Sequence, residues 1–197
     1  MSKTNLTPAN TYTYGGNPAM SLPDNPICTA DDYWNLPEGE RAELIDGQLY
    51  ALASPSRIHQ EIIIELTYHF QHYIKSNKGN CKIYAAPFAV NLNANDQTFV
   101  EPDISIICDK NKLDDKGCNG APDWIIEIVS PSSKRMDYYI KLFKYRTAGV
   151  REYWIVDPIR EMILVYDFEN DDYEQYSFSE IVKVRIYDDF EINFTTI

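Results

Sequence analysis

A continuous apolar run at residues 123–130, DWIIEIVS, sets the tightest limit on the fold of this chain. Such a run is typical of a strand in the middle of a sheet, where both faces are covered. One carboxylate, Glu127, interrupts the run, and a buried carboxylate needs a cation, a metal ion or a proton. The run therefore predicts a central strand that carries Glu127 into a functional site. The alternatives are a structural ion pair, or an edge strand with Glu127 facing water.

The rest of the chain predicts helices and strands in mixed order. Thr29 caps a short helix over 30–36, and Asp46-Gly47 predicts a tight hairpin turn. An apolar residue at every fourth position from Ile58 to Ile74 predicts a helix over 56–76. A further helix is predicted over 133–148, ended by Gly149, with an apolar stripe of Met136, Tyr139, Ile140, Phe143 and Val150. Strands are predicted at 82–92, 98–108, 152–157, 162–168, 173–178 and 182–186.

This order predicts an α/β (α+β) fold with a mixed β-sheet flanked by helices. With 44% hydrophobic residues, the chain can build a substantial core. We expect residues 28–197 to form a single domain. Residues 1–27, which contain Pro18, Pro23 and Pro26, are expected to form an irregular arm.

Charge and cysteine content narrow the classes of function. The net charge of −12 argues against nonspecific coating of nucleic acid, but an enzyme with a local basic rim remains compatible with it. No apolar run approaches the roughly 20 residues that span a bilayer, and no secretory signal precedes the domain, so the expected location is the cytoplasm. The four cysteines and three histidines form no zinc pattern, and free thiols are predicted for Cys28, Cys81, Cys108 and Cys118.

Asp103 is the second candidate site residue. In the segment VEPDISII, strand periodicity places Glu101, Asp103 and Ser105 on one face. Carboxylates from two neighbouring strands can converge, and oxygen ligands of this kind suit Mg²⁺ or Mn²⁺. Asp103 and Glu127 are therefore candidate metal ligands. The alternative for Asp103 is a carboxylate that caps backbone groups at a strand end.

Lys141 is the third candidate, on the helix that follows the Glu127 strand. It lies four residues after Asp137 and seven after Lys134, so the three side chains lie near one helix face. A lysine there could assist a metal-bound water or stabilise charge on a phosphoryl group. The alternative is an ordinary ion pair between Asp137 and Lys141 on a solvated face.

The combined pattern resembles the PD-(D/E)XK nucleases, and more specifically residues 43–158 resemble the Uma2 family of restriction-endonuclease-like proteins. The matching segments are ELIDG at 43–47, His59, APF at 86–88, EPDI at 101–104, PDWIIEIVSPS at 122–132, Lys141 with Tyr145, and GVREYWIVDP at 149–158. In the general signature, a lysine stands two residues after the glutamate. Here that position is Val129. The resemblance implies that Lys141 on the following helix fills the role, with Lys134 as the competing candidate.

The resemblance implies a metal-dependent endodeoxyribonuclease that hydrolyses DNA phosphodiester bonds. Asp103 and Glu127 would hold one or two Mg²⁺ (or Mn²⁺) ions, and Glu43 would complete the shell or anchor a second ion. Lys141 would orient the water and stabilise transition-state charge. By analogy with nucleases that cut both strands, a homodimer is a further hypothesis.

Two residues near this pattern keep two interpretations each. His59 either touches the substrate or serves as a capping or core histidine. Ser130 either supplies a hydroxyl at the edge of the site or starts the following helix. Positive charge on that helix either rims a DNA cleft or forms a solvated face, and its members are Lys134, Arg135, Lys141, Lys144 and Arg146.

Other functions fit the sequence less well. A glycosidase would also use two carboxylates but would not need Lys141, and no GxSxG elbow indicates a serine hydrolase. The main alternative is a catalytically degenerate nuclease-fold module that acts by binding a protein or a nucleic acid.

Overall fold

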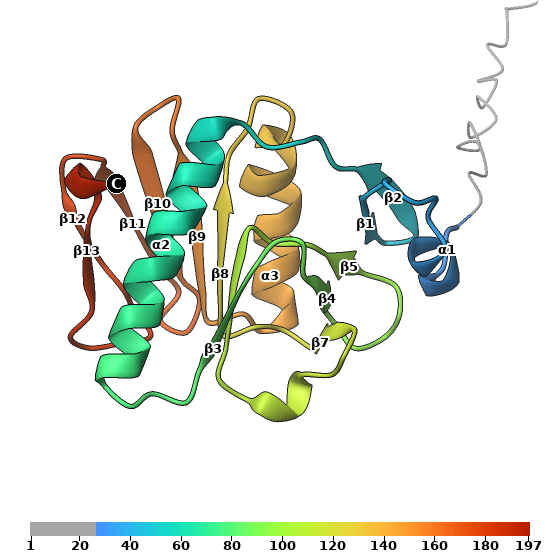
Figure 1. The fold of residues 1–197 in the computed structure, drawn as a ribbon, viewed down its shortest axis with the longest axis horizontal. Coiled ribbons are helices and arrows are strands. Elements are labelled where there is room, and N and C mark those ends of the chain that lie inside the picture. Colours follow the sequence, from blue (N-terminus) through green and yellow to red (C-terminus); the bar gives the residue numbers. More distant parts are fainter. Residues whose placement is uncertain (1–26) are drawn as a thin grey trace, which may run out of the picture.

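The computed structural model describes residues 27–197, so nearly all of the predicted N-terminal arm lies outside the described residues. The chain runs through short and long helices and strands in the mixed order that the sequence predicts. Most strands belong to two sheets, one of six strands and one of five (Figure 1). The predicted mixed β-sheet flanked by helices is confirmed.

The six-stranded sheet holds the Glu127 strand near its middle, in the order β11-β10-β9-β8-β6-β3. Every residue of β8 is buried, as the sequence predicts. β8 pairs in parallel with β9 and antiparallel with β6, which makes the sheet mixed. The six strands are β3 (Lys82–Ala85), β6 (Ile104–Ile107), β8 (Trp124–Ile128), β9 (Glu152–Asp157), β10 (Met162–Asp167) and β11 (Asp172–Ser177).

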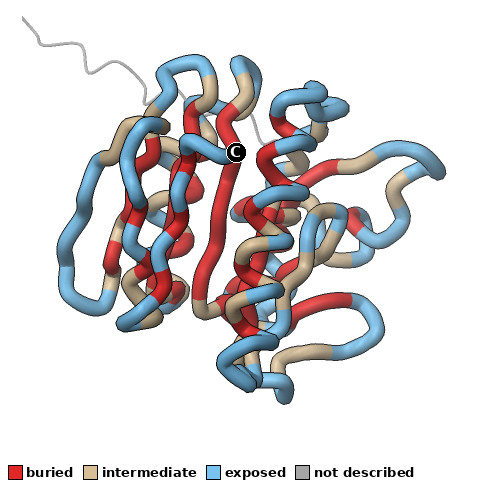
Figure 2. Tube along the Cα trace, turned by 60° about the vertical axis from the view of Figure 1, so that its left-hand side comes forward, coloured by how far each residue is buried: buried red, intermediate tan, exposed pale blue. Residues whose placement is uncertain are grey.

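Helices cover both faces of this sheet. On one face, α2 (Arg57–Ser76) packs Leu66 and Phe70 against Trp124 and Ile126 of β8. On the other, α3 (Leu142–Ala148) packs Tyr145 against Ile125 and other residues. Figure 2 shows that the buried residues concentrate in the central strands. Because strand side chains alternate between faces, Glu127 shares the face of Ile125 and points toward α3.

The five-stranded sheet is smaller and follows the order β2-β1-β5-β4-β7. The predicted hairpin between β1 and β2 is confirmed, with φ of 50° at Asp46 and 77° at Gly47. Helix α1 (Ala30–Trp34) packs Tyr33 against Leu44 and Phe99 of this sheet. Its strands are β1 (Ala42–Ile45), β2 (Gln48–Ala51), β4 (Ala89–Asn91), β5 (Phe99–Val100) and β7 (Gly117–Asn119).

Two strands were not predicted from the sequence. β7 lies in the polar segment before β8, where only three residues pair in parallel with β4. β13 (Glu191–Asn193) pairs with β12 (Ile181–Lys183) to close the C-terminal region. Both strands have three residues, too few for a periodicity to show. Short 3₁₀ helices span Lys110–Lys112 and Phe194–Thr196.

The predicted continuous strands at 82–92 and 98–108 are wrong. Each divides between the two sheets: β3 continues into β4, and β5 into β6. The breaks contain Pro87 and Pro102, which lack the backbone N–H that a continuing ladder needs. Glu101 and Asp103 therefore lie in the link between sheets rather than on one strand face.

The helix predicted over 133–148 contains an irregularity. Residues Met136–Lys141 form a π-helix that leads into α3. The predicted apolar stripe is wrong at Tyr139 and Phe143, which are 71% and 63% exposed. The wider π turn shifts the inward face, and the fully buried side chains are Asp137, Lys141 and Tyr145. Gly149, with φ of 94°, ends the helix as predicted.

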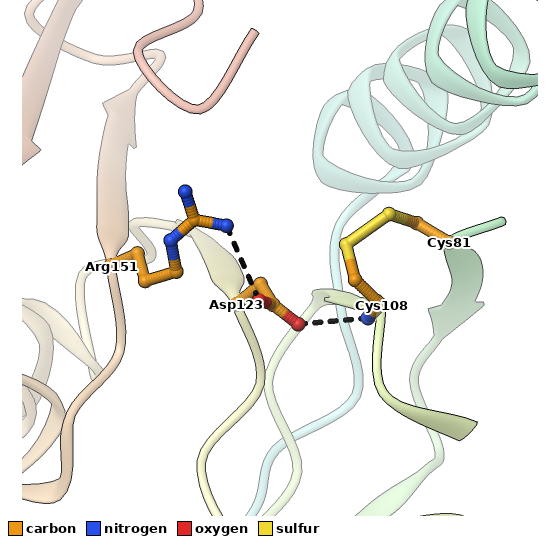
Figure 3. The surroundings of a disulfide bond; sticks show 4 residues. All are labelled: Cys81, Cys108, Asp123 and Arg151. Atoms are coloured by element: carbon orange, nitrogen blue, oxygen red, sulfur yellow. Dashed lines mark hydrogen bonds and ion pairs between the residues drawn. A yellow bond between two sulfur atoms is a disulfide. The ribbon is translucent and has the colours of Figure 1, made fainter. Parts of the chain in front are cut away.

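The prediction of free thiols is wrong for Cys81 and Cys108, which form a disulfide (Figure 3). Lys82 and Ile107 are paired in the β3–β6 ladder, so the next residues outward face each other. Cys81 and Cys108 are separated by 27 residues, a spacing that forms no recognisable pattern, and only the strand register brings them together. Cys118 keeps a buried free thiol.

Across residues 27–197, none of the helices combines the length and the apolar character that a membrane crossing requires.

Candidate functional site

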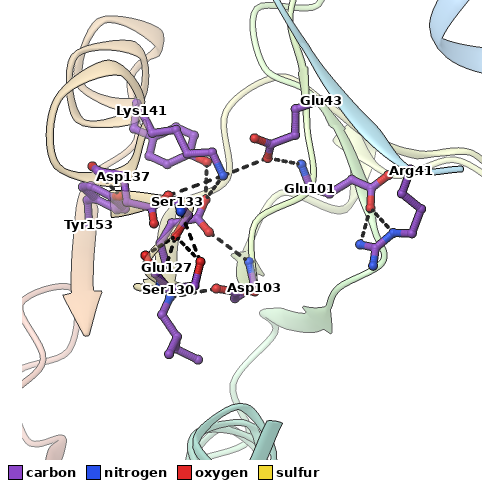
Figure 4. A network of polar contacts seen from close by, with 12 residues as sticks. Arg41, Glu43, Glu101, Asp103, Glu127, Ser130, Ser133, Asp137, Lys141 and Tyr153 are labelled. Carbon is purple, nitrogen blue, oxygen red and sulfur yellow. Dashed lines mark hydrogen bonds and ion pairs between the residues drawn. The ribbon is translucent and has the colours of Figure 1, made fainter. Parts of the chain in front are cut away.

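Glu127 lies at the centre of a buried polar cluster between β8 and the helix that follows it (Figure 4). Lys141 Nζ lies 2.8 Å from Glu127 Oε1. The Tyr145 hydroxyl donates to the same oxygen at 2.6 Å. The other carboxylate oxygen, Oε2, accepts a long hydrogen bond of 3.4 Å from the Asp103 backbone N–H. Oxygen Oε1 of the carboxylate is thus fixed by two strong donors, whereas Oε2 is held only weakly.

Lys141 joins the two sheets. Its Nζ lies 2.8 Å from Glu43 Oε1, and Glu43 belongs to β1 of the smaller sheet. Glu43 also accepts a hydrogen bond of 2.9 Å from the Glu101 backbone N–H. A third carboxylate, Asp137, stands 3.8 Å from the same nitrogen. The Lys141 ammonium is therefore held by three carboxylates from three segments of the chain.

Asp103 borders this cluster at the start of β6. Its Oδ2 accepts a hydrogen bond of 2.7 Å from the Ile128 backbone N–H. The same oxygen lies 3.1 Å from His59 Nε2, which the first turn of α2 supplies. The Asp103 side chain is 16% exposed, compared with 4% for Glu127. Asp103 therefore marks the side from which solvent reaches the cluster.

We call the six residues Glu43, Asp103, Glu127, Asp137, Lys141 and Tyr145 the Glu127 cluster.

The Glu127 cluster carries more negative than positive charge. Four of its members are carboxylic acids, and Lys141 is its only fixed cation. Burial raises the pKa of Glu127 well above its usual range, although Lys141 opposes the shift. Burial likewise raises the pKa of Asp137 to about 6, against the pull of Lys141. Burial lowers the pKa of Lys141, but Glu127 and Glu43 outweigh it and raise the pKa well above the usual range. Lys141 therefore stays charged, and the four carboxylic acids outnumber this single cation.

The charge of Asp103 also affects the pKa of His59. Burial lowers its pKa, but the hydrogen bond and charge of Asp103 outweigh that effect, so the pKa is raised overall. Its Nδ1 is buried and has no hydrogen-bond partner among the described residues. His59 therefore orients Asp103 through Nε2 and can carry a proton at the edge of the cluster.

The carboxylates at this site fit an ion such as Mg²⁺, which takes few ligands from the protein. Within residues 27–197, no group of three or more His, Cys, Asp or Glu side chains is arranged to hold a metal ion. Mg²⁺ commonly takes only one or two carboxylates and keeps several waters. Asp103 and Glu127 provide such a pair, and Asp137 Oδ1 is buried without a hydrogen-bond partner in the described part of the chain. In that part, this oxygen has only the 3.8 Å ion pair with Lys141. The excess of carboxylates and this incompletely paired oxygen fit a divalent cation that Asp103 and Glu127 would hold.

Two predicted substrate contacts lie outside the cluster. Ser130 belongs to the start of the helical segment: its hydroxyl accepts from the Ser133 N–H at 3.1 Å, and its own N–H donates to Ser133 Oγ at 3.0 Å. This is the helix-start role that the sequence left open. Lys134 is exposed, and none of the ion pairs among residues 27–197 includes it.

The predicted basic rim is largely neutralised. Lys141 is buried, Lys144 pairs with Asp46, and Arg146 pairs with Asp171. Lys134 and Arg135 remain as exposed basic side chains of this helical segment.

From the sequence, Tyr145 received no role, and Asp137 received none beyond a shared helix face or an ion pair with Lys141. Both lie at four-residue intervals from Lys141, and that spacing of polar residues beside a buried strand was the available signal. Glu101 was placed beside Asp103, yet it turns to Arg41, whose Nη2 lies 2.5 Å from Glu101 Oε2. Glu101 therefore does not join the Glu127 cluster.

The fold and the site define a mixed-sheet domain with a buried carboxylate–lysine cluster between two sheets. The Uma2 family model, described as "putative restriction endonuclease", matches residues 30–195. The chain belongs to the Uma2 family.

Two individual proteins are similar to it. The uncharacterized protein slr1290 of Synechocystis is 27% identical over 150 residues, which cover 75% of this chain and 77% of the relative. A crystal structure of a "putative nuclease belonging to DUF820" from Anabaena variabilis superposes with a TM-score of 0.69 at 20% identity. The match covers 85% of this chain and 95% of that one. At this identity the structural likeness establishes the fold.

Proposed function

We propose that this protein is a Mg²⁺- or Mn²⁺-dependent endonuclease that hydrolyses phosphodiester bonds in DNA. The observation that carries the proposal is the contact of 2.8 Å between Lys141 Nζ and Glu127 Oε1, with Asp103 bordering the same carboxylate. The description of the Uma2 family and the name of the Anabaena neighbour support the class of reaction. By analogy with enzymes that cut both strands, we extend the proposal to a homodimer.

The lysine assignment follows from the position of Glu127. Val129, where the general signature has a lysine, is 3% exposed and packs in the core on the α3 side. Lys141 brings an ammonium group to the same carboxylate from the helix. Lys134 is exposed and makes no contact with Glu127 among the described residues. We therefore assign the lysine role to Lys141.

Five residues of the cluster have a task in this proposal. A bound divalent ion supplies Lewis-acid polarisation of the phosphoryl oxygen and lowers the pKa of water. Asp103 and Glu127 would hold that ion, while Lys141 and Tyr145 donate to Glu127 Oε1 and fix the carboxylate. Lys141 orients the attacking water and stabilises charge on the phosphoryl group. Glu43 holds the ammonium group in place.

Mn²⁺ titration calorimetry and plasmid cleavage on the same samples test the proposal. The proteins compared are the wild type, the double variant Asp103→Asn/Glu127→Gln, and the control Glu61→Gln/Glu65→Gln, which removes two exposed carboxylates of α2. We expect wild type and control to bind Mn²⁺ and to nick plasmid, and the double variant to do neither. Cleavage that survives in the double variant would refute the assignment of the site.

A second candidate is a degenerate nuclease-fold module that works by association. The net charge of −12 favours it, because phosphate binding depends on Lys and Arg. Absence of site-dependent Mn²⁺ binding by the wild type would select this alternative. Mn²⁺ binding that requires Asp103 and Glu127 would exclude it.

A further inference from the structure

A second cleft opens on the smaller sheet, away from the Glu127 cluster. It has a volume of about 130 Å³ and lies between α1 and strands β4, β5 and β7. Both aromatic and polar side chains line it, chiefly Trp34, Asn91, Asp96, Phe99, Lys116 and Asn119. No residue of the Glu127 cluster lines it.

One wall of this cleft is aromatic. Trp34 is 42% exposed, and its ring meets Phe99 edge-on with the centroids 5.7 Å apart. Tyr33 stacks on Phe99 at 4.9 Å and fixes it from behind. The Lys116 ammonium lies 5.3 Å from the centroid of the Trp34 ring. Trp34 is therefore a partly exposed ring that already carries a cation over one face, and a planar group can stack on it in place of the exposed Lys116 side chain.

The floor carries an unsatisfied acceptor. Asn91 is only 6% exposed, and its Nδ2 donates to Asp96 Oδ1 at 3.0 Å. Its Oδ1 is buried and has no hydrogen-bond partner among residues 27–197. A buried carbonyl oxygen without a donor is unfavourable, and an N–H group of a ligand would satisfy it.

Asp96 and Asp114, the two carboxylates of the cleft, play different parts. Asp114 accepts from the backbone N–H groups of Lys116 and Gly117 and from Asn119 Nδ2, so its oxygens are committed to the loop. Among residues 27–197, Asp96 receives only the Asn91 amide, through one oxygen. The cleft thus offers acceptors, from Asn91 and Asp96, and one cationic donor, Lys116, beside an aromatic ring.

We propose that this cleft binds an unpaired DNA base that carries an exocyclic amino group, with Trp34 stacking on the base and Asn91 and Asp96 accepting its N–H groups. The inference rests on the proposed nuclease function and names the part of the substrate that the second cleft recognises. Aromatic stacking accepts any base. An exocyclic amino group offers two N–H donors to the two acceptors, whereas thymine offers only its single ring N–H, so the pair favours guanine, adenine or cytosine over thymine.

The position of the cleft suits this role. Phe99 precedes Asp103 by four residues, which span at most ~14 Å of chain. Successive nucleotides of a strand are ~3.4 Å apart in a duplex and farther apart in an unpaired strand, so the base would lie within about four nucleotides of a phosphate at Asp103. Two hydrogen bonds also connect the cleft wall to the Glu127 cluster. Tyr33, behind the wall, donates to Glu101 at 3.2 Å, and the Glu101 N–H donates to Glu43.

Tryptophan fluorescence measures base binding directly. Trp124 and Trp154 are fully buried in the core, so quenching by a solute reports on Trp34. The full-length protein is titrated with deoxyguanosine, deoxyadenosine, deoxycytidine and thymidine as free nucleosides. We expect saturable quenching by the three nucleosides with amino groups and at least several-fold weaker quenching by thymidine. Equal affinity for all four, or no saturation with any of them, would overturn the proposal.

Variants separate this site from the cleavage site. Trp34→Ala and Asn91→Leu should each weaken deoxyguanosine binding in equilibrium dialysis, the former on the order of tenfold or more. Tyr68→Ala, which removes an exposed aromatic side chain of α2, is the control and should bind normally. Trp34 is on the surface, so its variant should fold even if Asn91→Leu does not.

Glu127→Gln keeps the second cleft intact and should bind nucleosides like the wild type while it fails to cut DNA. Nucleoside binding without cleavage by the wild type would refute the proposed nuclease function alone. Cleavage without nucleoside binding would refute the proposed base site alone.

Discussion

The ammonium group of Lys141 lies 2.8 Å from Glu127 Oε1, although the two residues belong to different elements on one face of the sheet. The π-helix that carries Lys141 is what turns the lysine inward, together with Asp137. An ion pair at this depth is weak evidence of stability, because desolvation of both charges offsets their attraction. The pair, beside Asp103, therefore supports the catalytic role that we propose for Lys141.

Replacing Lys141 with methionine tests this pair. The variant keeps the length of the side chain but leaves the Glu43 and Glu127 carboxylates buried without a cation. We expect a loss of about 3–5 kcal/mol in the free energy of unfolding and loss of plasmid cleavage. Urea unfolding followed by circular dichroism gives the first quantity. The matched control is Lys134→Met, which should change stability by less than about 0.5 kcal/mol because this residue is exposed.

If Lys134→Met instead abolishes cleavage while Lys141→Met retains it, the catalytic lysine is Lys134.

Tyr145→Phe tests the second donor to Glu127. The substitution removes the hydroxyl that donates at 2.6 Å and keeps the ring in the core. We expect Mn²⁺ affinity to fall by about tenfold or more, because the loss of a group that orients a metal ligand has an effect of this size. Calorimetry with Mn²⁺ measures it. Tyr153→Phe is the control, since the Tyr153 hydroxyl donates to the Asp137 carbonyl and not to Glu127; equal effects of both changes would contradict a specific role for Tyr145.

The sequence predicts β8 and β9 well because their apolar runs leave no alternative to a buried strand. It also predicts Asp103, Glu127 and Lys141 as neighbours, through the resemblance to a family and through the buried carboxylate. The disulfide could not be predicted, because Cys81 and Cys108 meet only through the register of two strands.

The inward turn of Asp137 and Tyr145 also escaped sequence reasoning. A periodicity of 3.6 residues places Tyr139 and Phe143 on the core side, but the π-helix rotates them into solvent. The gain that offsets this exposure is the polar contact of Lys141 and Tyr145 with Glu127. A local pattern could not reveal it, because Glu127 is 14 to 18 residues away in the chain.

The disulfide should stabilise the edge of the large sheet. It closes a loop with a sequence separation of 27, for which the chain-entropy model gives about 3–4 kcal/mol. We expect Cys81→Ser/Cys108→Ser to unfold at lower urea than the oxidised wild type. Dithiothreitol should shift the wild type to the midpoint of the variant and leave the variant unchanged. A midpoint of the wild type that does not respond to the reductant would show that the bond does not contribute.

The stability of the metal-free protein should fall as pH rises through the range set by Asp137. Burial raises the pKa of this carboxyl from 3.8 to about 6, so between these values the folded state binds more protons than the unfolded chain. The free energy of unfolding therefore decreases with pH across this window, and the penalty is complete above the folded pKa. Glu127 and Glu152 add to the same slope, the latter because burial raises its pKa to about 7. Asp137→Asn should make the slope shallower without abolishing it, as measured by urea unfolding at pH values from about 4 to 7.

If bound Mn²⁺ supplies the missing positive charge, saturating Mn²⁺ should also flatten the slope in the wild type, and it should do so less in Asp103→Asn/Glu127→Gln. A wild-type stability that instead rises with pH over this window would mean that the carboxylates are better compensated than the buried geometry indicates.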